Sequence, residues 1–207
     1  MAAYGFNPDF LPSAPSDSSS DCSENPYPAF PMPMPVNTLT PMYPPLPQEC
    51  RRPETCTASE NNKAYYWVDT SVYGGVPSTA LKGGTDVDGD EIYVGRAFHE
   101  GDLIPAKVIP AKNVAYVAYG GQEVAKDCFQ VLCEQRFKWV FTRGGEIPPG
   151  AVQGGHTSDG EPLYIGRVYY SESFTVGKVH PSHGCLYIPF NCEEKSFHEF
   201  ETLVLES

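Results

Sequence analysis

The chain has 207 residues, enough for one or two compact domains, and a formal net charge of −12. This acidic balance argues against nucleic acid or an anionic membrane as its main partner, because both demand a basic face. No apolar stretch approaches the roughly 20 residues that a spanning helix needs, so we expect no membrane span.

The N-terminus has neither the positive segment nor the apolar segment of a secretory signal peptide. The seven cysteines are an odd number at irregular spacings, which is not typical of a disulfide framework. We therefore expect reduced cysteines and a cytoplasmic location. Secretion by an unconventional route is the alternative.

Composition divides the chain near residue 60. Thirteen of the 21 prolines lie at or before Pro53. Because proline fixes φ and cannot donate to a β-ladder, residues 1–62 are predicted to be a disordered tail with local polyproline II character. Within this tail, Pro44-Pro45-Leu46-Pro47 is a candidate docking motif for a WW- or SH3-type partner, although such short motifs also arise by chance.

After the tail, short aromatic and β-branched runs follow one another between Gly-Gly and Asp-Gly turns. In chain order, the expected strands lie at residues 65–68, 92–94, 115–119, 129–133, 137–141, 163–165, 186–190 and 199–203. No stretch shows a convincing 3.6-residue period with helix caps. The pattern predicts an all-β protein of short antiparallel strands.

One piece of the sequence occurs twice. Residues 83–132 and 154–203 match at a constant offset of 71 without a gap, and 14 of the 50 positions are identical. Ordinary amino-acid usage would give roughly three identities. Each full unit has about 65 residues, which is marginal for an independent core, and the link between the units is short. We therefore expect two repeats, at 63–135 and 136–207, that share one core under pseudo-twofold symmetry.

Three motifs recur in the same order in both copies. The second copy has Gly-Gly-His-Thr-Ser-Asp-Gly at 154–160, Leu-Tyr-Ile-Gly-Arg at 163–167 and Val-Gly-Lys-Val-His-Pro at 176–181. The first copy has Gly-Gly-Thr-Asp-Val-Asp-Gly at 83–89, Ile-Tyr-Val-Gly-Arg at 92–96 and Pro-Ala-Lys-Val at 105–108. These motifs resemble the DM-nine repeat family, found in invertebrate DM-nine proteins and in the lectin part of natterin-like proteins. The resemblance covers nearly all of residues 66–205 and none of the tail.

The resemblance implies a tandem-repeat, all-β lectin that binds mannose-type glycans and forms a homodimer, in an innate-immune or pattern-recognition setting. In the family, an acidic residue after the Gly-Gly pair and the lysine of the Pro-Gly-Lys motif hold the sugar. A carboxylate can accept two vicinal hydroxyls, and an ammonium can donate to their oxygens. The matching positions are Asp86, Asp88 and Lys107 in the first repeat, and Thr157, Asp159 and Lys178 in the second.

Each repeat departs from the family pattern at its own position. Thr157 has no charge where Asp86 has one, so we expect two related sites of unequal affinity. Ala106 replaces the glycine that the second repeat keeps as Gly177, and we expect the lost φ > 0 freedom to alter how Lys107 is presented. The residues alone leave simpler interpretations open, because Asp-Gly is a common turn and a strand-edge lysine is often merely solvated.

Four further charged residues repeat in register. Arg96 and Arg167 end the Tyr-x-Gly-Arg strand in the two copies and are candidate supporting residues. Glu123 and Glu194 are candidate carboxylate partners, because arginine clamps a carboxylate with two parallel hydrogen bonds. A structural ion pair and a role in ligand binding both stay open for these four residues.

A metal site and a catalytic thiol are not expected. His180, His183 and Cys185 fit no standard zinc spacing, and the equivalent positions of the first repeat hold Ile109, Lys112 and Val114. We therefore expect no cofactor and no enzymatic activity. A natterin-type pore-former is not expected either, because only four residues follow the last matched position, Leu203. The alternative to a lectin is an intracellular protein-interaction module whose proline-rich tail recruits a WW- or SH3-type partner.

Overall fold

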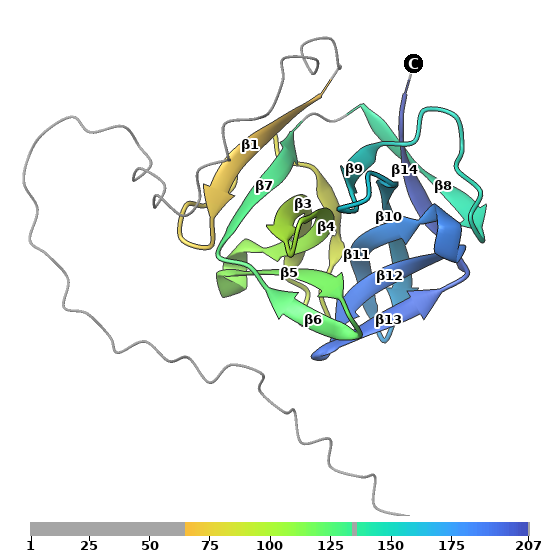
Figure 1. The fold of residues 1–207 in the computed structure, drawn as a ribbon. Helices are drawn as coiled ribbons and strands as arrows, with labels where there is room; N and C mark the ends of the chain where they lie inside the picture. The colour runs from red at the N-terminus through yellow and green to blue at the C-terminus, as the bar shows by residue number, and fades with distance from the viewer. Residues whose placement is uncertain (1–64, 134–135, 207) are drawn as a thin grey trace, which may run out of the picture. The chain divides into compact units, whose positions relative to one another are not determined.

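The computed structural model describes residues 65–133 and 136–206. The predicted disordered tail, with its candidate WW- or SH3-binding motif, lies outside the described residues. Within them, every regular element is a β-strand except for two single-turn 3-10 helices (Figure 1). The prediction of an all-β protein is therefore confirmed.

The first repeat supplies seven strands. A 3-10 turn, η2 (Pro110–Lys112), joins the fourth strand to the fifth, and its first residue is a proline whose fixed φ suits a helical start. The strands are β1 (Tyr66–Ser71), β2 (Lys82–Thr85), β3 (Glu91–His99), β4 (Asp102–Ile109), β5 (Val114–Tyr119), β6 (Gln122–Ala125) and β7 (Cys128–Cys133).

The second repeat supplies the same series again, including the 3-10 turn η3 (Pro181–His183). The strands are β8 (Phe137–Arg143), β9 (Gln153–His156), β10 (Pro162–Tyr170), β11 (Ser173–His180), β12 (Cys185–Phe190), β13 (Glu193–Phe197) and β14 (Glu199–Leu205). The domain limits expected from the sequence, 63–135 and 136–207, stay a prediction.

The 14 strands of the described residues form one sheet whose order mirrors the duplication. One half runs β1-β7-β3-β4-β5-β6, and the other continues β13-β12-β11-β10-β14-β8. The halves join where β6 pairs with β13, through Gln122 and Glu193. β2 pairs with β3, whereas β9 pairs with β10 of its own repeat and with β4 of the other. In Figure 1 the yellow-to-green strands of the first repeat lie beside the cyan-to-blue strands of the second.

The central apolar cluster belongs to both repeats. Ile92, Val94 and Leu132 from the first repeat pack with Ile165 and Leu203 from the second, and all five are fully buried. Burying one such side chain contributes roughly 1.5–3 kcal/mol. Neither repeat can form this cluster alone, so the prediction of a shared core under pseudo-twofold symmetry is confirmed.

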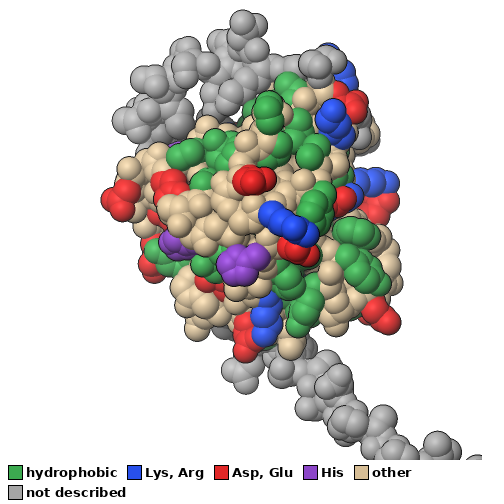
Figure 2. Space-filling model, turned by 90° about the vertical axis from the view of Figure 1, so that its right-hand side faces the viewer, with side chains coloured by type: hydrophobic (Ala, Val, Ile, Leu, Met, Phe, Trp, Pro, Cys, Tyr) green, Lys and Arg blue, Asp and Glu red, His purple; other side chains and the backbone are tan. Residues whose placement is uncertain are grey.

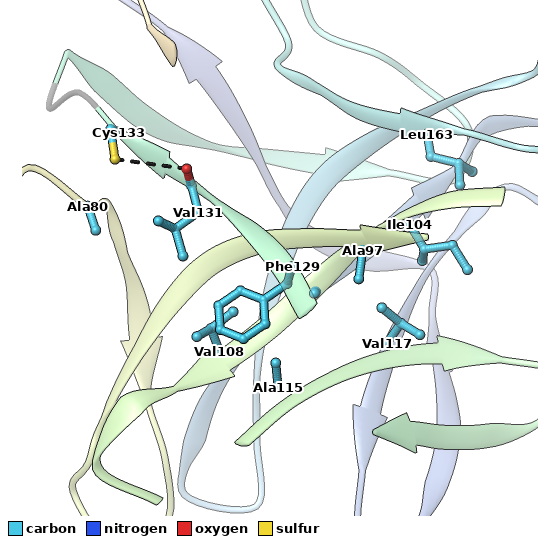
Figure 3. Packing of buried hydrophobic residues seen from close by; sticks show 11 residues of the cluster. Ala80, Ala97, Ile104, Val108, Ala115, Val117, Phe129, Val131, Cys133 and Leu163 are labelled. Carbon is cyan, nitrogen blue, oxygen red and sulfur yellow. Dashed lines mark hydrogen bonds between the residues drawn. The ribbon is translucent and has the colours of Figure 1, made fainter. Parts of the chain in front are cut away.

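Two further clusters lie on the other faces of the two half-sheets. Figure 3 shows the larger one, where Phe129 and Val131 of β7 pack near Val108 of β4 and Leu163 of the second repeat joins the residues of the first. The corresponding cluster of the second repeat contains Phe200 and Val179 at the equivalent positions. Strands buried on both faces explain why the expected strands read as apolar runs rather than as a strict alternation.

The Gly-Gly pairs at 83–84 and 154–155 let the two repeats pack closely against each other. A Cβ at Gly84 would overlap the backbone carbonyl of Phe174 in β11, and a Cβ at Gly155 would overlap that of Leu103 in β4. Glycine is required at these positions because two backbones approach each other closely. The paired glycines therefore mark the contacts between one repeat and the other.

The cysteines are not uniform. Cys133 and Cys185 are free and buried, whereas Cys128 and Cys192 are disulfide-bonded. The expectation of reduced cysteines is therefore wrong for two of the described positions, because irregular spacing along the chain does not report which sulfurs the fold brings together.

Among the helices of the described segments, none has the length and apolar character to cross a membrane.

Candidate functional site

Two lysines, one from each repeat, lie at the junction between the half-sheets. Lys107 in β4 and Lys178 in β11 are only 5% and 7% exposed. Tyr116 stands directly opposite the first and Tyr187 directly opposite the second, on the neighbouring strands. The alternative of a merely solvated strand-edge lysine does not apply to either residue.

Each lysine forms an ion pair with a glutamate of its own repeat. Lys107 Nζ lies 2.7 Å from Glu123 Oε1, and Lys178 Nζ lies 3.0 Å from Glu194 Oε1. The interpretation of these glutamates as partners of the two repeated arginines is wrong, because both glutamates pair with lysines. The arginines lie in β3 and β10, which face β7 and β14, whereas the glutamates lie in β6 and β13 beyond the intervening strands.

Each ammonium also donates to a backbone carbonyl of the other repeat. Lys107 Nζ donates to Pro189 O at 2.9 Å, and Lys178 Nζ donates to Ala118 O at 2.7 Å. An ammonium has three N–H donors, and Lys107 uses two of them, on Glu123 Oε1 and Pro189 O. Lys178 donates to Ala118 O, but its contact with Glu194 Oε1 is an ion pair without a hydrogen bond. Each lysine therefore bridges the repeats, and among the described residues the Lys107 ammonium keeps one N–H for a further acceptor.

Each of the two glutamates also accepts a hydrogen bond from a backbone N–H of the other repeat. Glu123 Oε2 accepts the Cys192 backbone N–H at 2.9 Å, and Glu194 Oε2 accepts the Gly121 backbone N–H at 2.8 Å. Removing one partner of a buried ion pair typically costs about 3–5 kcal/mol, because the other charge stays buried and unpaired. The two ion pairs therefore hold the repeats together, whatever else they bind.

Aromatic rings surround both ammonium groups and add a cation–π attraction. In each case one ring comes from the lysine's own repeat and one from the other repeat. The centroids of Tyr116 and Phe190 lie 5.3 and 5.9 Å from Lys107 Nζ, and those of Tyr187 and Tyr119 lie 5.3 and 5.5 Å from Lys178 Nζ.

The two repeated arginines have partners within the protein. Arg96 lies 4.1 Å above the ring of Trp67, and its Nε donates to Gln130 Oε1 at 2.7 Å. Arg167 lies 4.3 Å above the tryptophan of the second repeat, and its Nε donates to Glu201 Oε2 at 2.6 Å. Both guanidinium groups thus connect the strand after the Asp-Gly turn to the last strand of the repeat.

In the first repeat, an acidic turn after β2 closes around one lysine. The Asp86 N–H donates to Asp90 O, and the Gly89 N–H donates to Asp86 O, which folds residues 86–90. Lys112, at the end of η2, places its Nζ 2.7 Å from Asp86 Oδ2 and 2.5 Å from Asp88 Oδ2. Asp90 lies at 3.8 Å from the same ammonium. Three carboxylates therefore share one counter-charge.

The Asp86 carboxyl loses its proton more readily than a free aspartate. Burial opposes ionisation, but the hydrogen bonds from Lys112 and the Val87 backbone, with the charges of Lys112 and Lys107, outweigh it and lower the pKa of Asp86. Hydrogen bonds to Asp86 and Asp88 in turn raise the pKa of Lys112. The predicted pair of Asp86 and Lys107 is thus close enough to interact electrostatically, but the direct partner of Asp86 is Lys112.

The second repeat contains the same turn, but different side chains hold it in place. The Thr157 N–H donates to Glu161 O, and the Gly160 N–H donates to Thr157 O. Glu161 accepts the Ser182 backbone N–H at 2.9 Å and the Ser182 hydroxyl at 2.8 Å, and these hydrogen bonds lower the pKa of Glu161. Asp159 is exposed. One glutamate here anchors the turn that three aspartates anchor in the first repeat.

Two stacked histidines stand behind this turn. The rings of His180 and His183 lie 3.6 Å apart, and His180 Nε2 lies 3.2 Å from Glu161 Oε2. Burial, followed by the charge of His183, lowers the pKa of His180. Within residues 65–133 and 136–206, no group of three or more His, Cys, Asp or Glu side chains is arranged to hold a metal ion.

Lys112 is the residue of this site that the sequence does not single out. It aligns with His183, so a comparison of the repeats shows it only as a variable position. The available signal was the acidic run of Asp86, Asp88 and Asp90, which folds into one turn and needs a counter-charge nearby.

The glycine before the lysine serves packing and not backbone freedom. Gly177 is absent from the positions with positive φ, and a Cβ there would overlap the carbonyl oxygen of Tyr187. The expectation that Ala106 sacrifices φ > 0 freedom is therefore wrong. The two repeats differ instead in how closely β11 approaches β12 and β4 approaches β5.

Known proteins resemble this chain in sequence or in fold. The DM9 repeat matches residues 86–197. Natterin-4 of Thalassophryne nattereri is 28% identical over 134 residues, which cover 63% of this chain and 32% of that protein. The structure of the nematode sperm cell motility protein MFP2B has a TM-score of 0.53 at 14% identity, covers 74% of this chain and 53% of that one, and shows a likeness of fold alone. The chain thus spans about a third of Natterin-4. Because the repeat match covers more than half of the 207 residues, the chain belongs to the DM9 repeat family.

Proposed function

We propose that the chain is a non-catalytic carbohydrate-binding protein of lectin type, with mannose-type glycans as its ligands. Membership of the DM9 repeat family and the similarity to Natterin-4 support a lectin-like role. The observation that carries the proposal is that the Lys107 ammonium, which keeps one N–H, is among the charges that lower the pKa of Asp86.

The chemistry of a sugar fits these two groups. The ionised Asp86 carboxylate accepts two vicinal hydroxyls, and the remaining N–H of Lys107 donates to a hydroxyl or ring oxygen. Such charge-assisted hydrogen bonds are roughly twice as strong as neutral ones. Lys107 is already fixed by Glu123 and Pro189, so ligand binding orders no flexible side chain there.

A glycan array on the wild-type protein, followed by calorimetry with the best ligand, tests the proposal. We expect retention on mannose-type glycans and a loss of about tenfold or more in affinity for Asp86→Asn, which keeps the shape and removes the charge. Asp127→Asn removes the same charge from an exposed position on another turn and serves as the control. Absence of wild-type binding to every glycan would refute the lectin proposal.

The second repeat is proposed as the weaker of two related sites. Thr157 stands where the first repeat has its carboxylate, and Lys178 is the matching ammonium. Thr157→Asp is expected to raise the calorimetric stoichiometry from one ligand per chain toward two. A stoichiometry that stays at one would show that the second repeat holds no latent site.

The wider setting is also a proposal. We infer an innate-immune or pattern-recognition role, a homodimer, and either a cytoplasmic location or unconventional secretion, of which the disulfide-bonded Cys128 and Cys192 favour the second. Sedimentation velocity of the full chain checks the dimer. Fractionation of cells that express the chain checks the compartment.

A further inference from the structure

A row of aromatic rings leads away from Lys107 across the second repeat. The ring of Phe190 lies 5.9 Å from Lys107 Nζ, and its centroid lies 5.2 Å from that of Tyr170. Tyr170 in turn lies 5.2 Å from Phe197. Tyr170 is 36% exposed, so the row begins at the buried ammonium and reaches the surface.

The hairpin that carries Tyr170 ends in a constrained turn. β10 and β11 are joined by Ser171 and Glu172, which both adopt the left-handed conformation, at φ 48° and 64°. Non-glycine residues hold such angles only where the surrounding structure enforces them. Next to the turn, Tyr169 packs on Phe174 at 5.1 Å and stays 61% exposed. The exposed tyrosines therefore stand on a fixed support.

The first repeat has no such row. At the equivalent positions, His99 packs edge-on against Tyr119 at 4.7 Å, and Lys126 replaces the outer phenylalanine. The Lys107 ammonium contacts residues of the other repeat, so the aromatic row of the second repeat begins beside Lys107 of the first. The aromatic row and Asp86 are therefore both linked to Lys107: the Phe190 ring lies beside its ammonium, and its charge helps to lower the pKa of Asp86.

Polar groups border the row. Lys195 and Glu193 form an ion pair on β13, and Lys195 lies close enough to Tyr170 to interact with it electrostatically. Figure 2, which shows the side of the molecule that lies on the right in Figure 1, presents hydrophobic patches between Lys, Arg, Asp and Glu side chains. An aromatic face with a polar rim suits a ligand that has both an apolar face and hydroxyls.

We propose that Phe190, Tyr170 and Phe197 form a stacking subsite for the second pyranose ring of a glycan. This inference rests on the proposed function, in which Asp86 and Lys107 hold the first ring. A pyranose presents a face of C–H groups, which the electron-rich face of an aromatic ring attracts. Its hydroxyls at the ring edge would meet the ion pair on β13. The ligand of the whole site is thus an oligosaccharide and not a single sugar.

Calorimetry with two probes, methyl α-mannoside and mannotriose, tests the subsite. We expect wild-type protein to bind the trisaccharide about five- to tenfold more tightly than the monosaccharide, the gain typical of aromatic contacts. Tyr170→Ala is expected to erase this gain and to leave monosaccharide affinity unchanged, whereas Tyr170→Phe keeps the ring and the gain. His99→Ala, the equivalent change in the first repeat, is the matched control and should alter neither affinity.

The outcomes separate the two proposals. No wild-type binding to either probe refutes the proposed function, and the subsite with it. Monosaccharide binding without any gain for the trisaccharide refutes the subsite alone. An equal loss in Tyr170→Ala and His99→Ala also refutes it. Thermal unfolding of each variant shows whether a loss of binding reflects a loss of folding.

Discussion

The acidic turns of the two repeats share one backbone and differ in what holds them. In the first repeat, Lys112 binds the carboxylates of Asp86 and Asp88. In the second, Glu161 accepts hydrogen bonds from Ser182 and meets His180. Duplication has thus preserved the frame, and the charges on it have diverged. A frame held by backbone pairing and a shared core tolerates such exchange at its exposed turns.

The junction between the repeats shows the opposite behaviour. Lys107 and Lys178 keep the same two kinds of contact, a glutamate of their own repeat and a carbonyl of the other. Both ammonium groups are buried, so a change on one side would leave an unpaired charge on the other. Burial therefore explains why the lysines match between repeats while the turns do not.

The largest expected effect comes from breaking the junction. Lys107→Met should lower the free energy of unfolding by about 3–5 kcal/mol, because Glu123 stays buried without its counter-charge. Lys107→Met with Glu123→Gln should recover much of this loss, since neither residue is then charged. Urea unfolding of both variants measures the difference. Equal stability of the single and double variants would contradict the role of the ion pair.

A smaller effect is expected at the turn of the first repeat. Lys112 occupies carboxylate oxygens that a sugar would use, so Lys112→Ala should tighten glycan binding by about two- to fivefold, the strength of an exposed ion pair. Lys82→Ala removes the same charge from the exposed pair with Glu91 and is the control. Weaker binding by the Lys112 variant would instead make this lysine a sugar contact.

The smallest effect is a difference in acid sensitivity between the turns. The pKa of His180 is lowered from 6.5, so the unfolded turn takes up this proton first and the folded turn loses stability as pH falls below about 6.5. The lowered pKa of Glu161 acts in the same direction below 4.5, whereas that of Asp86 acts only below 3.8.

Hydrogen-exchange protection factors, corrected for intrinsic rates, measure this contrast between pH 7 and pH 5. Protection at residues 157–161 should fall across this range, and protection at residues 86–90 should not. His180→Gln should remove the pH dependence of the second turn. Equal behaviour of the two turns would contradict the distinction drawn between their anchors.

Much of the fold was predictable because short stretches of the sequence specify it. The constant offset of 71, the Asp-Gly turns and the aromatic runs predict strands, repeats and a shared core. Contacts across the junction were not predictable, since Lys107 and Pro189 are 82 positions apart in the chain. The sequence of β4 does not indicate which carbonyl the Lys107 ammonium will contact. The role of Gly177 was not predictable for a similar reason, because its close approach to Tyr187 depends on the neighbouring strand.

The site was predictable only in part. The alignment led to Asp86 and Lys107, and the structure shows them close enough for their charges to interact. It did not lead to Lys112, which lies on a different element and aligns with a histidine, His183, in the second repeat. The proximity of the Phe190 ring to Lys107 was not predictable either, because the ring comes from the other repeat.

The central claim is that one strong sugar site forms at the Asp86 end of the junction from both repeats. Calorimetric titration of the full chain with a mannose-type trisaccharide tests it most directly. We predict one strong site per chain, lost in Asp86→Asn and retained in Asp127→Asn. Two equal sites per chain, or a single site indifferent to Asp86→Asn, would contradict the claim.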